Sequence, residues 1–357
     1  MSKNNRKYFM YLNAILSSFA VVVLHTVANP VSLGIAKIQP TFYVILCLII
    51  GIVFSYGVPM FFMQSGANIL SYRNRYDTKT FFHKRINKVV IPFVVWSILG
   101  FLLIYGHNGG TLNIKAFIQG FLSGTLVGPY WFFYNIIGFY LCAPFVSLII
   151  IHGNRSLIKY TILLMVTVNT ILPVISLVTK TNNLFGVSVP FVGSYAQYFI
   201  AGWYLTNNEI SKKRTYQLYF LAIIMLLFEI GATIYFTFFY RHLAVLNYPG
   251  GIVKTFGDIS MFPSFCVMCS LFLFLKDREP QLKVSTHKNI LVILAGLTFG
   301  IYLIHPFVIT WVLNPLNSLV HLPLIIMIIT DPIFVFILSG TITFTMKKVK
   351  LINKLVP

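Results

Sequence analysis

Two histidines lie inside long apolar stretches of the sequence, where burying an ionisable side chain costs free energy. His25 ends the run YLNAILSSFAVVVLH, and His305 lies in FGIYLIHPFVI. An imidazole with a pKa of about 6.5 can take a proton from a hydroxyl at neutral pH. Alternatively, His25 could be a neutral ring bonded to a neighbouring helix, and His305 could satisfy the backbone carbonyl that Pro306 leaves free.

Three acids and one aromatic pair lie in or at the ends of similar apolar runs. Glu229, Asp258 and Asp331 could each orient a histidine, or could be proton-relay carboxylates of a transporter. Tyr130 and Trp131 open another apolar run and could contact a substrate, or could anchor a helix at the membrane interface. Sequence alone leaves each pair of alternatives open.

The segment SYRNRYDTKTFFHKRINK, residues 71–88, holds the densest positive charge and includes Arg73, Arg75 and Arg85. Forked guanidinium groups suit phosphate oxygens, so this segment could hold a phosphorylated donor such as coenzyme A. The alternative is the general excess of basic residues on the cytoplasmic side of membrane proteins, with contacts to anionic lipids. The sequence has no P-loop, no dinucleotide glycine fingerprint and no metal-ligand spacing, so we expect no bound metal.

Membrane helices must position these residues, because 57% of the 357 residues are hydrophobic and only 10% are charged. Soluble domains carry about 25% charged residues, so a soluble enzyme is excluded. Runs of roughly 20 apolar residues predict an all-α bundle of about ten transmembrane helices. The predicted spans are 8–28, 41–64, 89–105, 130–151, 160–178, 191–206, 217–240, 257–275, 290–313 and 323–346. We expect the first to be a retained helix, since no small-residue cleavage site follows it.

Basic residues in short loops set the orientation of such a bundle. With both termini in the cytoplasm, most of the 27 Lys and Arg residues lie inside. The exceptions are Lys37, Lys115, Lys180, Arg241 and Lys254. The net charge of +20 then reflects membrane topology, and no nucleic-acid partner is predicted. In this orientation His25, His305 and Trp131 are expected at a similar level in the outer half of the bilayer.

The stretch between the third and fourth predicted spans, residues 106–129, is half apolar. It could form a short helix on the outer face, or re-enter between the spans. Since extramembrane stretches are short, we expect one integral-membrane domain over residues 1–357.

Several stretches together resemble the membrane acyltransferase 3 family. The run YLNAILSSFAVVVLHTVANP is similar to that family's first helix, which ends on a hallmark histidine. VPMFFMQSGANILSYRNRYDTKTFFHKRINKVVIPFVVWS resembles its second helix, basic loop and third helix. GPYWFFYNIIGFYLCAPFVSLI, YFIAGWYL and FGIYLIHPFVI resemble later segments in the family's order. The resemblance covers nearly the whole chain.

This resemblance implies a multi-pass O-acyltransferase of a bacterial plasma membrane, moving acetyl from acetyl-CoA to a hydroxyl of an envelope polysaccharide or lipid-linked oligosaccharide. His25 would be the hallmark histidine, acting as base or acyl relay. Arg85, Arg73 and Arg75 would hold the donor, which is a substrate rather than a permanently bound cofactor. Trp131 and His305 are candidates for the substrate site.

One position departs from the family pattern. Many members of the family carry an arginine eleven residues before the hallmark histidine, where this sequence has Ala14. Asn13 or the Arg73–Arg75 pair could replace it. A second class of function, an exporter of polysaccharide intermediates, would instead use Glu229, Asp331 and the histidines as proton or substrate sites.

Overall fold

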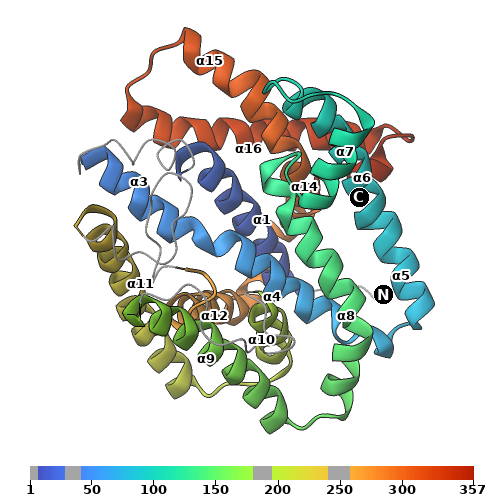
Figure 1. Cartoon of the computed structure of the whole chain (residues 1–357). Coiled ribbons are helices and arrows are strands. Elements are labelled where there is room, and N and C mark those ends of the chain that lie inside the picture. Colours follow the sequence, from blue (N-terminus) through green and yellow to red (C-terminus); the bar gives the residue numbers. More distant parts are fainter. Residues whose placement is uncertain (1–6, 29–41, 180–194, 240–257) are drawn as a thin grey trace. The chain divides into compact units, whose positions relative to one another are not determined.

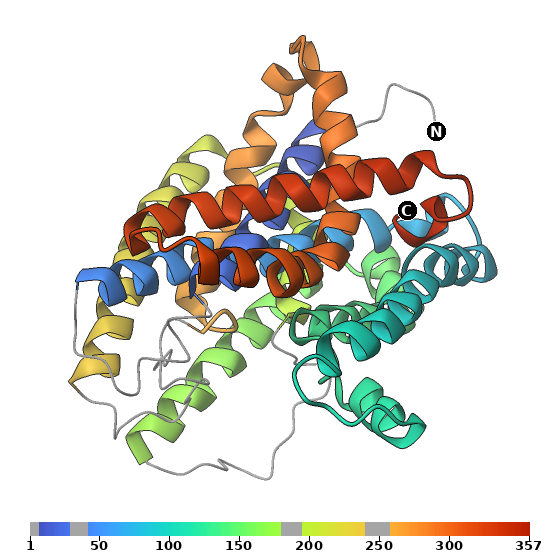
Figure 2. The same ribbon diagram turned by 90° about the horizontal axis from the view of Figure 1, so that it is seen from above.

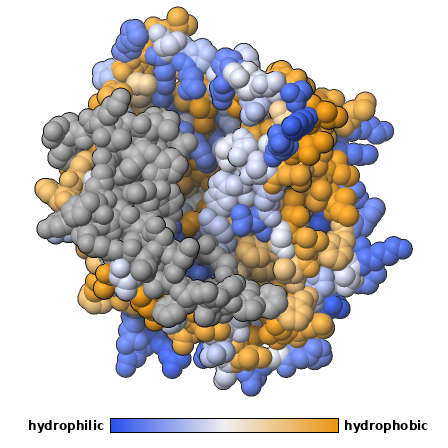
Figure 3. Space-filling view, in the orientation of Figure 1, coloured by the Kyte–Doolittle hydropathy of each residue, from blue (hydrophilic) through white to orange (hydrophobic). Residues whose placement is uncertain are grey.

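The computed structural model describes residues 7–28, 42–179, 195–239 and 258–357, which form helices and connecting turns without a strand (Figure 1). Within these residues, eight helical stretches are long and apolar enough to cross a membrane. They are Tyr8–Val27, Phe42–Asn74, Thr78–Tyr105, Gly128–His152, Arg155–Ile175, Lys212–Phe238, Lys288–Leu319 and Leu324–Lys348. Apolar side chains cover much of the visible surface (Figure 3). The prediction of an all-helical membrane protein is confirmed.

Two of the predicted spans correspond to shorter helices. Helix α10 (Ala196–Asn207) and helix α12 (Phe262–Asp277) overlap the predicted spans 191–206 and 257–275 and end one and two residues beyond them. At about 1.5 Å per residue they extend roughly 18 and 24 Å. Both predicted ranges also include residues outside the described part, so the count of ten and the orientation stay predictions. Six of the basic residues used for the orientation also lie outside it: Lys3, Arg6, Lys37, Lys180, Arg241 and Lys254.

The chain divides into two compact units, each built from two stretches of sequence. The first unit comprises Met1–Leu70 and Ile149–Leu291, and the second comprises Ser71–Leu148 and Val292–Pro357. His25 therefore belongs to the first unit. The basic segment, Trp131 and His305 belong to the second.

In the first unit, close backbone contact joins α4 (Gly57–Ile69) to α1 (Tyr8–Val23) and to α10. A Cβ atom at Gly66 would lie 1.7 Å from the Phe199 carbonyl oxygen, and one at Gly202 would lie 2.0 Å from that of Met63. Small residues allow membrane helices to approach this closely. Close packing matters there because lipid chains are as apolar as the side chains, so no hydrophobic driving force brings the helices together. The pair therefore fixes how α4 and α10 cross.

The first unit contains further helices besides α1, α4 and α10. They are α3 (Phe42–Val53), α9 (Arg155–Thr179), α11 (Lys212–Phe238), α12 and α13 (Glu279–Val284). Where α11 packs on α12, the buried hydroxyl of Ser264 donates to the buried carboxylate of Glu229. Glu279 of α13 accepts a hydrogen bond of 2.7 Å from the backbone N–H of Phe9, so a carboxylate caps the start of α1.

The second unit holds α5 (Thr78–Arg85), α6 (Ile91–Gly100), α7 (Ile114–Ser123), α8 (Trp131–His152), α14 (Lys288–Val308), α15 (Asn314–Leu319) and α16 (Leu324–Lys348), the long red helix in Figure 2. The last turn of α8 and the first of α14 extend into the first unit. Aromatic rings form much of its core, with Phe93 stacked on Phe133 at 5.0 Å and on Phe121 at 5.4 Å.

The segment 106–129 contains a short helix, and its position relative to the membrane stays a prediction. Helix α7 begins after Asn113, whose side chain accepts a 2.8 Å hydrogen bond from the Ala116 N–H. It ends before Gly124, whose φ of +72° lies in the left-handed region that glycine adopts without strain. These caps limit α7 to ten residues.

Candidate functional site

His25 lies at the end of the first helix, where α1 continues as a wider π-helical turn over Leu24–Ala28. Its Nδ1 atom lies 2.8 Å from the carbonyl oxygen of Val21. A carbonyl oxygen can only accept a hydrogen bond, so this contact places the proton of the neutral ring on Nδ1. Nε2 then carries the lone pair and is the nitrogen that can act as a base. The side chain is partly exposed.

Polar side chains nearer the start of α1 face α4. The Asn13 amide donates to the Met60 carbonyl oxygen at 3.1 Å and to Gln64 Oε1 at 2.8 Å. One turn further, Ser17 is also fully buried. Ala14, where the family pattern has arginine, is buried as well. The neutral amide pair of Asn13 and Gln64 therefore lies beside Ala14. Sequence reasoning named Asn13 but missed Gln64.

Arg85 of the basic segment lies among aromatic rings. Its guanidinium group is 5.4 Å from the ring centre of Phe81 and 5.5 Å from that of Tyr140, and Nη2 donates to Tyr76 Oη at 3.4 Å. Its buried Nε makes no hydrogen bond to any described residue. Cation–π contacts leave most of the guanidinium donors available, unlike a bidentate ion pair with a carboxylate.

Arg73 is bound differently. Nε donates to Ser147 Oγ at 2.9 Å, and Nη2 donates to the Pro144 carbonyl oxygen at 3.2 Å. Both partners lie on α8, and Pro144 is the proline inside that helix. Arg73 thus ties the loop before α5 to α8.

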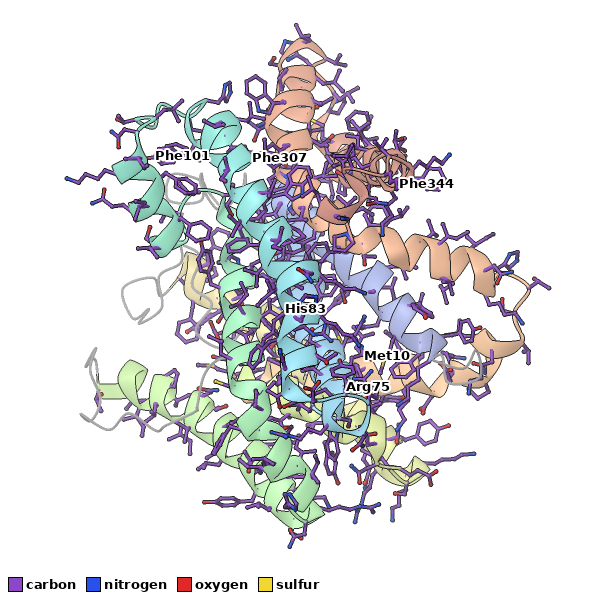
Figure 4. All side chains as sticks on the ribbon, turned by 90° about the vertical axis from the view of Figure 1, so that its right-hand side faces the viewer. Met10, Arg75, His83, Phe101, Phe307 and Phe344 are labelled. Carbon is purple, nitrogen blue, oxygen red and sulfur yellow. The ribbon has the colours of Figure 1, made fainter. Side chains whose placement is uncertain are left out.

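Two further cations of the segment lie against the Tyr76 ring. Lys84 Nζ lies 3.9 Å from the Tyr76 ring centre, and the Arg75 guanidinium lies 5.5 Å from it. Figure 4 shows Arg75 before α5 and His83 on that helix. The acid of the segment, Asp77, caps α5 by accepting hydrogen bonds from Thr80, which lower the pKa of its carboxyl. Sequence reasoning named the arginines but missed their aromatic partners, although aromatic and basic residues alternate in YRNRYDTKTFFHKR.

His305 makes the same kind of local contact as His25. Its Nδ1 atom lies 3.2 Å from the Ile301 carbonyl oxygen, and the side chain is fully buried. The carbonyl that Pro306 leaves without its usual partner belongs to Tyr302, so the imidazole bonds to a different carbonyl from the one expected. The Tyr302 ring meets His305 edge-on at 5.6 Å.

Two tyrosine hydroxyls join α14 to the start of α8. Tyr130 donates to the Leu303 carbonyl oxygen at 2.8 Å, and Tyr302 donates to that of Pro129 at 2.6 Å. Trp131, the next residue, is partly exposed. The structure therefore fixes Trp131 and His305 within one interlocked part of the second unit.

The acids Glu229, Asp258 and Asp331 each accept a hydrogen bond from a hydroxyl or amide group, and their pairing with a histidine stays a prediction. Glu229 accepts from Ser264, Asp258 accepts from Ser260, and Asp331 accepts a 2.9 Å hydrogen bond from Asn317. No group of three or more His, Cys, Asp and Glu side chains that could hold a metal ion occurs among the described residues.

A helical membrane protein with a histidine on its first helix and a basic loop after its second fits a membrane acyltransferase. The family model for the acyltransferase domain, acyltransferase 3, matches residues 15–346. The chain therefore belongs to the membrane acyltransferase 3 family and is a multi-pass membrane acyltransferase. Neither the curated proteins nor the solved structures contain a match to this chain.

Proposed function

We propose that this chain is an O-acyltransferase of a bacterial plasma membrane. It moves acetyl from acetyl-CoA to a hydroxyl group of a cell-envelope polysaccharide or a lipid-linked sugar. The observation that carries the proposal is the Nδ1 contact of His25 with Val21, because it places the lone pair of a partly exposed imidazole on Nε2. Membership of an acyltransferase family supports the same reaction class.

In the proposed reaction, Nε2 of His25 takes the proton from the acceptor hydroxyl as its oxygen attacks the thioester carbonyl. The C–S bond then breaks, and the proton passes from the imidazolium to the leaving thiolate. In a second version, Nε2 itself attacks the thioester carbonyl, the C–S bond breaks and coenzyme A leaves as its thiolate. The acceptor hydroxyl then attacks the acetyl group, the C–N bond to Nε2 breaks, and Nε2 takes the hydroxyl proton before releasing it to the thiolate or to solvent. Both versions need the lone pair on Nε2.

The donor phosphates are assigned to the basic segment. Arg85 lies against aromatic rings, so its guanidinium edge can bind phosphate oxygens, and Arg75 is the second arginine assigned to the donor. Arg73 belongs to the same segment but already donates to two acceptors on α8. Trp131 and His305 remain candidates for the acceptor site.

The proposal is tested with membranes that contain the chain, acetyl-labelled acetyl-CoA and an envelope glycan extract. We expect label in an alkali-labile ester, and none from membranes without the chain. Succinyl-labelled succinyl-CoA, supplied in parallel, tests the donor. If unmodified glycan crosses vesicles without acyl-CoA and no ester forms, the chain is an exporter and the proposal is wrong.

A further inference from the structure

Helix α7 carries three large apolar side chains in a row on one face. Ile114, Ile118 and Leu122 follow one another at four-residue spacing, and they are 80%, 50% and 74% exposed. Side chains four residues apart on a helix lie one above the other, so these three form a continuous strip. We call this strip the α7 row. The rest of the described part of the chain leaves the α7 row far more exposed than large apolar side chains in water normally are.

Another face of α7 is fixed against the second unit. The Phe117 ring packs on Phe101, labelled in Figure 4, at 5.3 Å, and Phe121 stacks on Phe93 at 5.4 Å. The Tyr134 hydroxyl donates to the Phe121 carbonyl oxygen. Because these contacts set the rotation of α7 about its axis, the α7 row points away from this core.

We propose that α7 lies in the headgroup region of the bilayer, with the α7 row inserted among the lipid chains. The helix joins the end of the span Thr78–Tyr105 to the start of the span Gly128–His152. Its ten residues extend about 15 Å, too short to cross a hydrocarbon core of roughly 30 Å. It therefore begins and ends on the same side of the membrane.

Neighbouring side chains support a lipid partner. The exposed Leu102 and Leu103 lie in the last turns of the preceding span, so α7 follows directly on a stretch that presents apolar side chains at its surface. The exposed Lys115 and Gln119 are next in sequence to row members and turn about 100° away from them. An apolar strip bordered by polar side chains is typical of helices that lie in the membrane interface.

This placement has a consequence for α8. Tyr134, which holds α7, follows Trp131 by about one turn, so α7 anchors the start of α8 at the membrane surface. The inference concerns the lipid contact alone and does not rest on the proposed acyl transfer.

Fluorescence quenching in reconstituted vesicles tests the proposal. The exposed Cys142 is first replaced by serine, and the buried Cys47, Cys266 and Cys269 are retained. Ile118→Cys and the matched control Gln119→Cys are then labelled with bimane. We expect lipids brominated near the headgroup to quench Ile118→Cys several-fold more than Gln119→Cys, and aqueous iodide to show the reverse.

Two results would overturn it. Equal iodide quenching of both labels would place the α7 row in water or under a soluble partner. Strongest quenching of Ile118→Cys by bromine at the chain ends would indicate a re-entrant helix. If Ile118→Cys fails to reconstitute, Ile114→Cys with Lys115→Cys as its control makes the same comparison.

Discussion

The Nδ1 atom of His25 lies 2.8 Å from the carbonyl oxygen of Val21, one turn earlier in the first helix. His305 repeats this relationship with Ile301 at 3.2 Å. In both rings the contact selects the tautomer with its proton on Nδ1 and the lone pair on Nε2. The rings differ in access, since His305 is fully buried and His25 is partly exposed. His25 is therefore the better placed of the two to meet a substrate.

Arg85 and Arg73 should respond differently to substitution. Arg85→Lys keeps the charge but loses the forked donors, so we expect the KM for acetyl-CoA to rise about 10-fold or more, as for loss of a hydrogen bond between charged groups. Arg73→Lys breaks its contacts with Ser147 and Pro144, so we expect a lower thermal stability and a smaller change in KM.

Kinetics across a range of acetyl-CoA concentrations, together with thermal unfolding in detergent, measure both effects. Lys79→Ala is the control, because Lys79 is an exposed cation of the same segment. A KM unchanged in Arg85→Lys, or raised equally in Lys79→Ala, would contradict a specific phosphate contact at Arg85.

Asn13 and Gln64 should be coupled. Asn13→Leu removes the hydrogen bonds to Met60 and Gln64 and leaves the half-buried Gln64 amide oxygen without this donor, so we expect a loss of about 1–3 kcal/mol in the free energy of unfolding. Adding Gln64→Leu should recover part of this loss. A double-mutant cycle measures the coupling free energy, and additive effects of the two substitutions would show that the side chains act independently.

The glycines at the crossing of α4 and α10 should not tolerate even one methyl group. Gly66→Ala and Gly202→Ala each place a Cβ against backbone atoms that cannot move aside, so we expect little folded protein in detergent extracts. Gly231→Ala is the matched control. A Cβ there meets nothing within 4 Å, and alanine should stabilise the helix by roughly 0.5–1 kcal/mol. Normal yields of folded Gly66→Ala and Gly202→Ala would contradict this packing.

Glu229 should contribute to packing rather than to turnover. Glu229→Gln keeps an oxygen that can accept the Ser264 hydrogen bond, so we expect near-native acyl transfer. Glu229→Leu leaves the buried Ser264 hydroxyl without this acceptor and should lower the thermal stability. Transfer assays and unfolding of the two variants separate these effects. Loss of transfer in a stably folded Glu229→Gln would instead favour a proton-relay role.

The sequence predicted the membrane class and the helical bundle well, because an apolar run of twenty residues, such as Tyr8–Val27, forms few stable structures other than a membrane-spanning helix. It also named the arginines of the basic segment. The contacts among helices could not be predicted, since Asn13 meets Gln64, and Arg85 meets Tyr140, only after distant stretches pack. Val21 precedes His25 by one helical turn, so a contact between them is possible from the sequence alone. The residue types do not reveal that the Val21 carbonyl oxygen orients the ring.

The most direct test compares acetyl transfer by native protein, His25→Ala and His25→Asn in the same vesicles, with labelled acetyl-CoA and acceptor glycan. Asparagine can still donate to the Val21 carbonyl oxygen but has no basic nitrogen. We expect both variants to fold and to lose at least about 100-fold in transfer rate, within the range for removal of a general base. Near-native transfer by either variant would contradict the assignment of His25 as the residue that carries the chemistry.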